Sequence, residues 1–123
     1  MEVVLIGQNR PCLMKIISFL SNHQNINCYD TDSLEAALEK VVAEKVDLVI
    51  LEERFDSISG FQFAESLIEK NPMLYLAFIS DLSGEDFHEA TEGLGVIGSI
   101  PTSPLQEDID GILSQIDRIQ SML

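Results

Sequence analysis

Two carboxylates, Glu52 and Glu53, directly follow an apolar stretch that runs from Val46 to Leu51 and is interrupted only by Asp47. A short run that is apolar on both faces is typical of a central parallel strand covered by helices on each side. The carboxyl ends of such strands form the edge at which open α/β sheets place their binding and catalytic residues. We therefore expect Glu52 and Glu53 to lie at the functional edge of a parallel sheet.

The chemistry of this edge depends on which polar side chains join the two glutamates. Glu52, Glu53, Asp56 and Asp81 could gather there, and carboxylates alone bind Mg²⁺ or Ca²⁺ weakly. No pattern in the sequence fixes their geometry, so unpaired surface acids are the default interpretation. Close packing of such like charges would raise the pKa of one of them.

Enzymatic chemistry finds little support elsewhere in the sequence. Ser80 has no neighbouring base motif for hydrolysis, and no glycine-rich phosphate loop follows the first strand-like segment. His23 and His88 stand alone in the sequence, and we expect both to be exposed and without a partner at catalytic spacing. The sequence therefore predicts a protein that is not an enzyme and has no catalytic residue.

The charge of the chain limits its partners. The 123 residues include 21 Asp and Glu against 7 Lys and Arg, which gives a net charge of −14. This excess repels phosphate backbones, so we expect no nucleic-acid binding, and it favours basic partner surfaces. No apolar run approaches the roughly 20 residues of a membrane span. Cys12 and Cys28 lack metal or disulfide-exchange spacing, and we expect reduced thiols in a cytoplasmic protein.

Five strand-like segments alternate with five helical patterns along the chain. The strands are expected at residues 3–6, 26–29, 46–51, 74–79 and 96–100. This alternation predicts a parallel sheet with helices on both faces and right-handed crossovers. Because no linker or internal repeat interrupts the pattern, we expect one domain that spans residues 1–123.

Local signals predict where several helices begin. Asp32 and Glu35 have the spacing of a capping box, and Ser83 is expected to cap a helix over residues 85–92. That helix should turn Phe87 and Ala90 inward.

The clearest helical stripe of the sequence lies between the second and third strands. Its apolar residues recur at helical spacing: Leu34, Ala37, Leu38, Val41 and Val42. After the third strand, residues 56–60 lack such a pattern, and we expect a loop there.

The stretch Asp47-Leu48-Val49-Ile50-Leu51-Glu52, followed eight residues later by Gly60, resembles the core motif of response-regulator receiver domains. In that family an aspartate, a hydrophobic run and a second aspartate precede a loop that ends in Met-Asp-Gly. Pro72, Ser80 and Ser103-Pro104 fall at matching landmarks, so the resemblance covers essentially the whole chain. It implies a flavodoxin-like doubly wound (βα)5 fold, with a parallel five-stranded sheet in the order 2-1-3-4-5.

The family's chemistry is the Mg²⁺-dependent transfer of a phosphoryl group onto an aspartate. The resemblance places Gly7 and Gln8 where the family has a metal-holding acid pair, and Glu52 where it has the acceptor aspartate. Ser80 stands at the Thr or Ser that binds the phosphoryl oxygens, and Ser103 stands at the lysine. Only Ser80 keeps the family's residue type. The resemblance therefore implies a degenerate phosphoacceptor pocket, in which Mg²⁺ binding is lost or weak and no cofactor is held.

Glu52 suggests a further hypothesis. Its carboxylate reaches further than that of an aspartate, and a phosphoryl group carries about −1.5 to −2 charges with three acceptor oxygens. A hydrogen bond from Ser80 to Glu52 would then fix one state of the family's switch. The alternative is a solvated carboxylate at the end of a strand, and the sequence slightly favours this alternative.

The resemblance implies a pseudo-receiver, acting in two-component (phosphorelay) signal transduction as a protein-interaction module. Its partner would be a kinase or an output domain, and the contact surface would be the fourth helix, fifth strand and fifth helix. Two alternatives stay open: a receiver that accepts phosphoryl groups, and the N-terminal regulatory domain of a longer output enzyme. The last helix ends with Ile116, Ile119, Met122 and Leu123, which fit core packing, a homodimer seam or continuation into an output domain.

Overall fold

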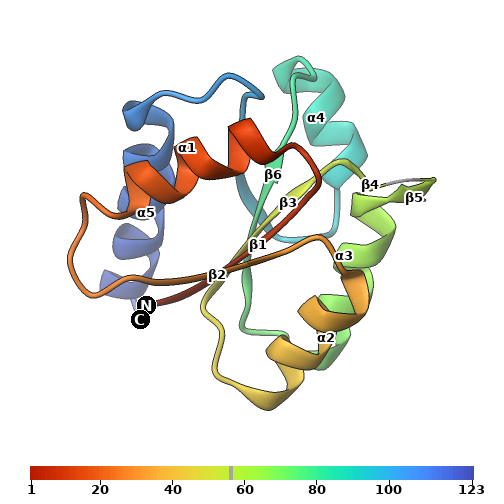
Figure 1. Cartoon of the computed structure of the whole chain (residues 1–123), viewed down its shortest axis with the longest axis horizontal. Helices are drawn as coiled ribbons and strands as arrows, with labels where there is room; N and C mark the ends of the chain where they lie inside the picture. The colour runs from red at the N-terminus through yellow and green to blue at the C-terminus, as the bar shows by residue number, and fades with distance from the viewer. Residues whose placement is uncertain (56) are drawn as a thin grey trace.

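A five-stranded parallel sheet forms the centre of the computed structural model, which describes residues 1–55 and 57–123 (Figure 1). Its strands are β1 (Glu2–Ile6), β2 (Asn27–Thr31), β3 (Leu48–Glu52), β6 (Tyr75–Ile79) and β7 (Val96–Ile100). They lie in the order β2-β1-β3-β6-β7, and each neighbouring pair is parallel. Counting only these five strands, the order is 2-1-3-4-5, which confirms the predicted doubly wound sheet.

Helices cover both faces of this sheet. In Figure 1, α1 (Arg10–Leu20) and α5 (Gln106–Ser121) lie on one side of the sheet. On the other side lie α2 (Leu34–Ala43), α3 (Gly60–Lys70) and α4 (Gly84–Thr91). Alternate strand residues point to opposite faces: in β1, Val3 and Leu5 join the core beneath α1 and α5, whereas Val4 and Ile6 join the other core.

Serine side chains cap three of the described helices, namely Ser33 on α2, Ser59 on α3 and Ser83 on α4. Ser83 caps α4 as predicted, because its Oγ accepts a hydrogen bond from the Asp86 N–H at 3.2 Å. The capping prediction for α2 was wrong by one residue. Ser33, rather than Asp32, has the extended backbone of an N-cap, and its Oγ accepts from the Ala36 N–H at 3.1 Å. A sequence that offers two adjacent capping residues does not say which one takes the non-helical conformation.

Two predicted core positions are on the surface. Val42 is 62% exposed, because it lies about 100° around the helix from buried Val41. Ala90 is also exposed, and Thr91 takes the buried position on α4. Thr91 lies four residues after Phe87, and its Oγ1 donates to the Phe87 carbonyl at 2.9 Å. The inward position of Phe87 is confirmed, because its ring packs against the core.

A small antiparallel ribbon lies between β3 and α3, and its second strand falls within the predicted loop of residues 56–60. Its strands are β4 (Arg54–Phe55) and β5 (Ile58–Ser59), which pair with each other and not with the main sheet. Phe55 is buried and anchors the ribbon to the core. Asp56, which the sequence placed in the loop and among the clustered acids, lies outside the described residues.

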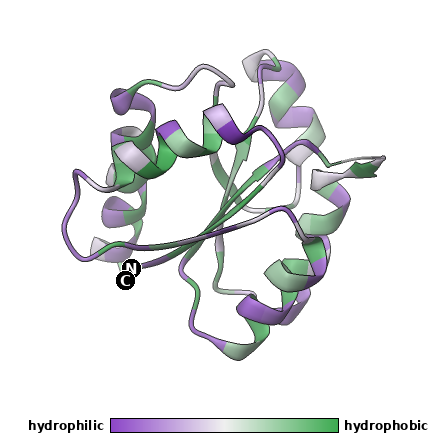
Figure 2. Cartoon of the chain, in the orientation of Figure 1, coloured by the Kyte–Doolittle hydropathy of each residue, from purple (hydrophilic) through white to green (hydrophobic). Residues whose placement is uncertain are grey.

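The last helix packs on the sheet through its first half and leaves its end exposed. Ile109, Ile112, Leu113 and Ile116 are buried, Ile119 is half-buried, and Met122 and Leu123 are exposed. Figure 2 shows a related pattern, with hydrophobic colour on the central strands and hydrophilic colour on much of the helices and of the edge strand β2. None of the helices within residues 1–55 and 57–123 has both the length and the apolar character required to cross a membrane.

Candidate functional site

The polar residues predicted to form a pocket lie at the carboxyl edge of the sheet. Gly7 and Gln8 follow β1, Glu52 ends β3, Ser80 follows β6, and Ser103 lies in the connection from β7 to α5. The structure brings Gly7, Gln8 and Glu52 into contact. Ser80 is held by Glu53, the residue after Glu52. Ser103 is exposed and makes no hydrogen bond to other described residues.

Glu52 folds back over β1. Its carboxylate oxygen Oε1 accepts a hydrogen bond from the backbone N–H of Gln8. A Cβ atom added to Gly7 would lie 2.5 Å from Oε1, 2.7 Å from Cδ and 2.8 Å from Cγ of Glu52. The Gly7 N–H donates to the Thr31 carbonyl at 3.1 Å, which fixes the backbone beside the carboxylate. Gly7 and Glu52 therefore form a matched pair, in which the missing side chain of one makes room for the other.

This pairing predicts a specific coupling between two mutations. Gly7→Ala should lower the free energy of unfolding by about 1–2 kcal/mol, because the new methyl group displaces the Glu52 carboxylate from the Gln8 N–H. In a Glu52→Ala background the same substitution should cost less than about 0.5 kcal/mol, since nothing is left to displace. Urea unfolding of the four proteins of this cycle measures the coupling.

The matched control for the cycle is Gly84→Ala. Gly84 has no heavy atom within 4 Å of an added Cβ, so its replacement should be independent of Glu52. Equal costs of Gly7→Ala in the two backgrounds would contradict the arrangement.

Glu53, and not Glu52, holds Ser80. The Ser80 hydroxyl is buried and donates to Glu53 Oε2 at 2.7 Å, while it accepts from the Leu82 N–H at 3.1 Å. The hypothesis that Glu52 binds Ser80 is therefore wrong about the residue. Glu53 takes this place because of the direction of the chain after β3. The Glu53 N–H donates to the Ile79 carbonyl at 3.3 Å, which draws Glu53 toward β6. Glu52 turns the other way, toward β1.

A second contact, which the sequence analysis missed, joins the two neighbouring loops. Asp81 accepts from the Thr102 N–H at 2.9 Å and from the Thr102 hydroxyl at 2.6 Å. These two hydrogen bonds, that of the hydroxyl first, lower the pKa of Asp81 from its ordinary value of 3.8. The loop that follows β6 is thus tied to the loop that follows β7, one residue before Ser103.

The Asp81–Thr102 contact predicts a pH dependence. A carboxyl group with a lowered pKa stabilises the fold fully above its unfolded value of 3.8, and the contribution is lost as the pH falls through the lower folded value. Thr102→Val should therefore be less stable than the wild type above pH 3.8, and the difference should shrink at lower pH. Urea-unfolding midpoints across the acid range measure it.

Thr31→Val provides the control for this series. The Thr31 hydroxyl accepts from the Ser33 N–H and makes no hydrogen bond to an ionisable side chain of the described residues, so the cost of this substitution should not depend on pH in this way. A Thr102→Val cost that stays constant from neutral to strongly acid pH would contradict the predicted linkage.

The geometry does not fit the Mg²⁺ ion on which the chemistry of the receiver family depends. Gly7 and Gln8 supply no carboxylate, and the Glu52 carboxylate lies in the space that a residue-7 side chain would use. That carboxylate is also engaged by the Gln8 N–H. Mg²⁺ demands near-ideal octahedral oxygen ligation, and this arrangement offers no such set. Among the described residues, no group of three or more His, Cys, Asp or Glu side chains is placed to hold a metal.

The two histidines differ in their surroundings. His23 is half-buried and its Nε2 lies 2.7 Å from Asp110 Oδ1, so the prediction of an exposed, unpartnered side chain was wrong; His88 is exposed as predicted.

Both cysteines are free thiols. Burial raises the pKa of Cys12, and the charges of Glu52 and then Asp81 raise it further, which places this thiol beneath the site. Cys12 is therefore expected to be unreactive at neutral pH.

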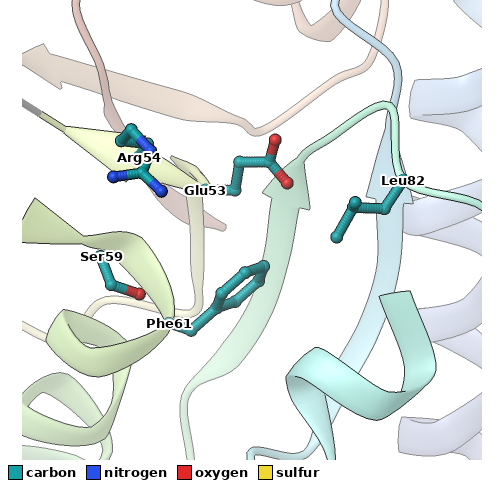
Figure 3. Close-up of a pocket in the computed structure, with 5 residues that line it drawn as sticks. All are labelled: Glu53, Arg54, Ser59, Phe61 and Leu82. Atoms are coloured by element: carbon teal, nitrogen blue, oxygen red, sulfur yellow. The ribbon is translucent and has the colours of Figure 1, made fainter. Parts of the chain in front are cut away.

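A pocket of about 240 Å³ lies beside the Ser80–Glu53 hydrogen bond. It is lined by Glu53, Arg54, Ser59, Phe61 and Leu82, which come from the end of β3, the ribbon, the start of α3 and the β6–α4 loop (Figure 3). Glu53 was predicted at this edge, but the pocket could not be predicted, because the ribbon that forms one of its walls has no sequence signal.

Comparisons with known proteins identify the fold. The sequence matches no protein-family model and no curated protein. Among solved structures, a two-component response regulator from Clostridium difficile is 14% identical, with a TM-score of 0.82 and coverage of 97% of this chain and 98% of that one.

Two further structures give the same result. The non-phosphorylated receiver domain of the stress response regulator RcsB from Escherichia coli is 14% identical, with a TM-score of 0.83 and coverage of 96% and 93%. The signal receiver domain of an HD domain-containing protein from Pseudomonas fluorescens Pf-5 is 13% identical, with a TM-score of 0.77 and coverage of 97% and 91%. The chain therefore has the flavodoxin-like fold of response-regulator receiver domains.

Proposed function

We propose that this chain is a receiver-like signalling module that is not phosphorylated and acts by binding a protein partner in the cytoplasm. The observation that carries the proposal is the position of Glu52. Its carboxylate folds over Gly7 and accepts from the Gln8 N–H, so it fills the space in which a metal-holding side chain of residue 7 would lie.

The residues of the site argue against phosphoryl transfer. Enzymes and phosphoacceptors stabilise the transferring group through positioning, metal ions and cations, because the group carries spread negative charge. Ser103 supplies no positive charge at the lysine position, and Gly7 and Gln8 supply no carboxylate for a metal ion. Glu52, at the acceptor position, has a carboxylate that is already hydrogen-bonded. We therefore propose that Mg²⁺ is not a cofactor of this protein.

The same contacts support a role that does not need phosphorylation. Glu53 holds the Ser80 hydroxyl, and Asp81 holds Thr102, so the loops after β6 and β7 are fixed by groups that belong to the chain itself. Loops that are held by these internal hydrogen bonds can present a single conformation to a partner without phosphorylation. The net charge of −14 favours a basic partner surface, and a kinase or an output domain is the expected class. The face of α4, β7 and α5 is proposed as the contact surface by analogy with the fold alone.

Partner affinity with and without a phosphoryl donor tests this function. The intact chain would be used to recover partners from its source cells by crosslinking, and each affinity would be measured by calorimetry. Acetyl phosphate with Mg²⁺ should leave the affinity within about twofold. A tenfold change would contradict the proposal, and so would failure to recover any partner whose binding survives purification.

A second candidate, a regulatory domain within a longer enzyme, is favoured by one comparison. The Pseudomonas fluorescens relative is named as the receiver domain of an HD domain-containing protein. The exposed Met122 and Leu123 at the end of α5 would then continue into an output domain, or would meet a second copy in a homodimer. An immunoblot of an extract of its source cells would show whether the chain is part of a longer protein with an output domain. Light scattering of the purified 123-residue chain would show whether it forms a homodimer.

A further inference from the structure

The pocket beside Ser80 is lined by two opposite charges that do not pair. Glu53 and Arg54 both line it, yet Arg54 makes no ion pair with any described carboxylate. Glu53 Oε2 accepts from Ser80, whereas Oε1 makes no hydrogen bond to the described residues. Figure 3 shows the Arg54 guanidinium and the Ser59 hydroxyl on one side of the pocket, Leu82 on the other, and the Phe61 ring between them.

From this arrangement we infer that the pocket binds a small zwitterion, namely a free α-amino acid with an aliphatic side chain. A simple anion would meet the Glu53 carboxylate, and a simple cation would meet the Arg54 guanidinium, so either one would leave a like charge beside it. A ligand that carries both charges satisfies both residues. Its carboxylate would lie at Arg54 and the Ser59 hydroxyl, and its ammonium group at Glu53.

The walls and size of the pocket define the rest of the ligand. Phe61 and Leu82 supply the apolar surface, and Leu82 is 40% exposed, so a ligand side chain placed there would remove apolar area from water. The volume of about 240 Å³ lies below the range of about 300–1,000 Å³ that is typical for drug-sized ligands. It therefore suits a molecule of amino-acid size.

A ligand bound in this pocket would perturb the carboxyl edge of the sheet through the contacts of Glu53 and Leu82 with Ser80. Glu53 accepts from the Ser80 hydroxyl, which in turn accepts from the N–H of Leu82, and Leu82 lines the same pocket. An ammonium group that binds Glu53 Oε1 would share the carboxylate with the Ser80 hydroxyl on Oε2 and would weaken that hydrogen bond. This inference goes beyond the proposed function, because it adds a small-molecule input to a module that is not phosphorylated.

Titration of the whole chain with L-leucine, followed by amide-correlation NMR, tests the inference. A ligand of about nine non-hydrogen atoms can reach a dissociation constant of about 1 mM or tighter, so a range to about 10 mM is sufficient. We expect saturable shifts at Glu53, Arg54, Ser59 and Leu82. Two single-charge analogues, 4-methylpentanoate and 3-methylbutylamine, should each bind at least about tenfold more weakly, since each lacks one ionic contact.

Substitutions in the pocket complete the design. Arg54→Gln should weaken L-leucine binding about tenfold and remove its advantage over 3-methylbutylamine, whereas Arg118→Gln, on exposed α5, should change neither. Arg54 is exposed, so its replacement should leave the fold intact. The inference is overturned if L-leucine, L-isoleucine, L-valine and L-methionine all give no saturable shift, if the single-charge analogues bind equally well, or if Arg54→Gln has no effect. None of these results bears on phosphorylation, which the Mg²⁺ and phosphoryl-donor experiments test separately.

Discussion

Phe78→Ala is expected to lower the free energy of unfolding by about 3–5 kcal/mol, enough to remove a large part of the stability of a domain of this size. Phe78 is the largest fully buried side chain of the molecule's described part, with 0% of its surface exposed. Its ring centroid lies 4.6 Å from that of Phe61 on α3 and 6.3 Å from that of Phe87 on α4. Truncation leaves a cavity and breaks both aromatic contacts, because these two helices meet the sheet through this ring.

Phe63→Ala is the matched control for this substitution. Phe63 carries the same side chain on α3 but is only half-buried, so its truncation should cost roughly 1–2 kcal/mol. Urea unfolding followed by far-ultraviolet circular dichroism measures both. A cost for Phe78→Ala no greater than that of Phe63→Ala would show that the α3–α4 side of the core is not packed around this ring.

Gly60→Ala should destabilise the protein by about 3 kcal/mol, through a clash that no side-chain movement can relieve. A Cβ at residue 60 would lie 2.0 Å from the carbonyl oxygen of Glu52 and 3.1 Å from its carbonyl carbon. The Gly60 N–H also donates to the Glu53 carbonyl at 2.8 Å, so the start of α3 cannot move away without breaking this bond. The substitution would therefore displace the backbone of both glutamates at the site.

Gly111→Ala is the matched control, and we expect it to stabilise the protein instead of destabilising it. Gly111 lies inside α5 with no heavy atom within 4 Å of an added Cβ, and alanine favours helix by about 0.5–1 kcal/mol over glycine. Thermal unfolding of the two variants should thus move in opposite directions. If Gly60→Ala were as harmless as Gly111→Ala, the close approach of α3 to the end of β3 would be incorrect.

Much of the fold could be predicted from the sequence because its signals are local and redundant. The run before Glu52 is apolar on both faces, and Pro72 separates it from the next apolar segment, while Gly93 and Pro101 flank the last one. Strand β3 accordingly lies at the centre of the sheet, with Glu52 at its carboxyl end. The strand boundaries differ from the predicted ones by at most two residues at either end.

The details of the site could not be predicted, because they depend on the direction of single side chains. Glu52 and Glu53 are identical in type and adjacent, yet one turns to Gln8 and the other to Ser80. The choice follows from the hydrogen bond between the Glu53 N–H and the Ile79 carbonyl, which is a contact between strands far apart in the sequence. The ribbon of β4 and β5 consists of two-residue strands, too short for any periodic pattern.

The connection after β7 shows the limit of reasoning from a resemblance. Ser103 is predicted to line the pocket because it stands at the lysine position, and in the structure it is exposed and makes no hydrogen bond to other described residues. Its neighbour Thr102 makes the contact instead, through two hydrogen bonds to Asp81. Asp81 and Thr102 are 21 residues apart, and neither belongs to a motif that would have paired them.

The most direct test of the central claim is an amide-correlation NMR titration with Mg²⁺, and then with Mg²⁺ and beryllofluoride, a phosphoryl mimic. The control is the triple variant Gly7→Asp, Glu52→Asp and Ser103→Lys, which restores the receiver family's residue types at these three positions. The account predicts that the peaks of Gly7, Gln8, Glu52, Glu53 and Ser80 stay in place in the wild type, because the Glu52 carboxylate occupies the site. Shifts of these peaks that occur together and saturate in the wild-type chain would contradict the account and identify a working phosphoacceptor.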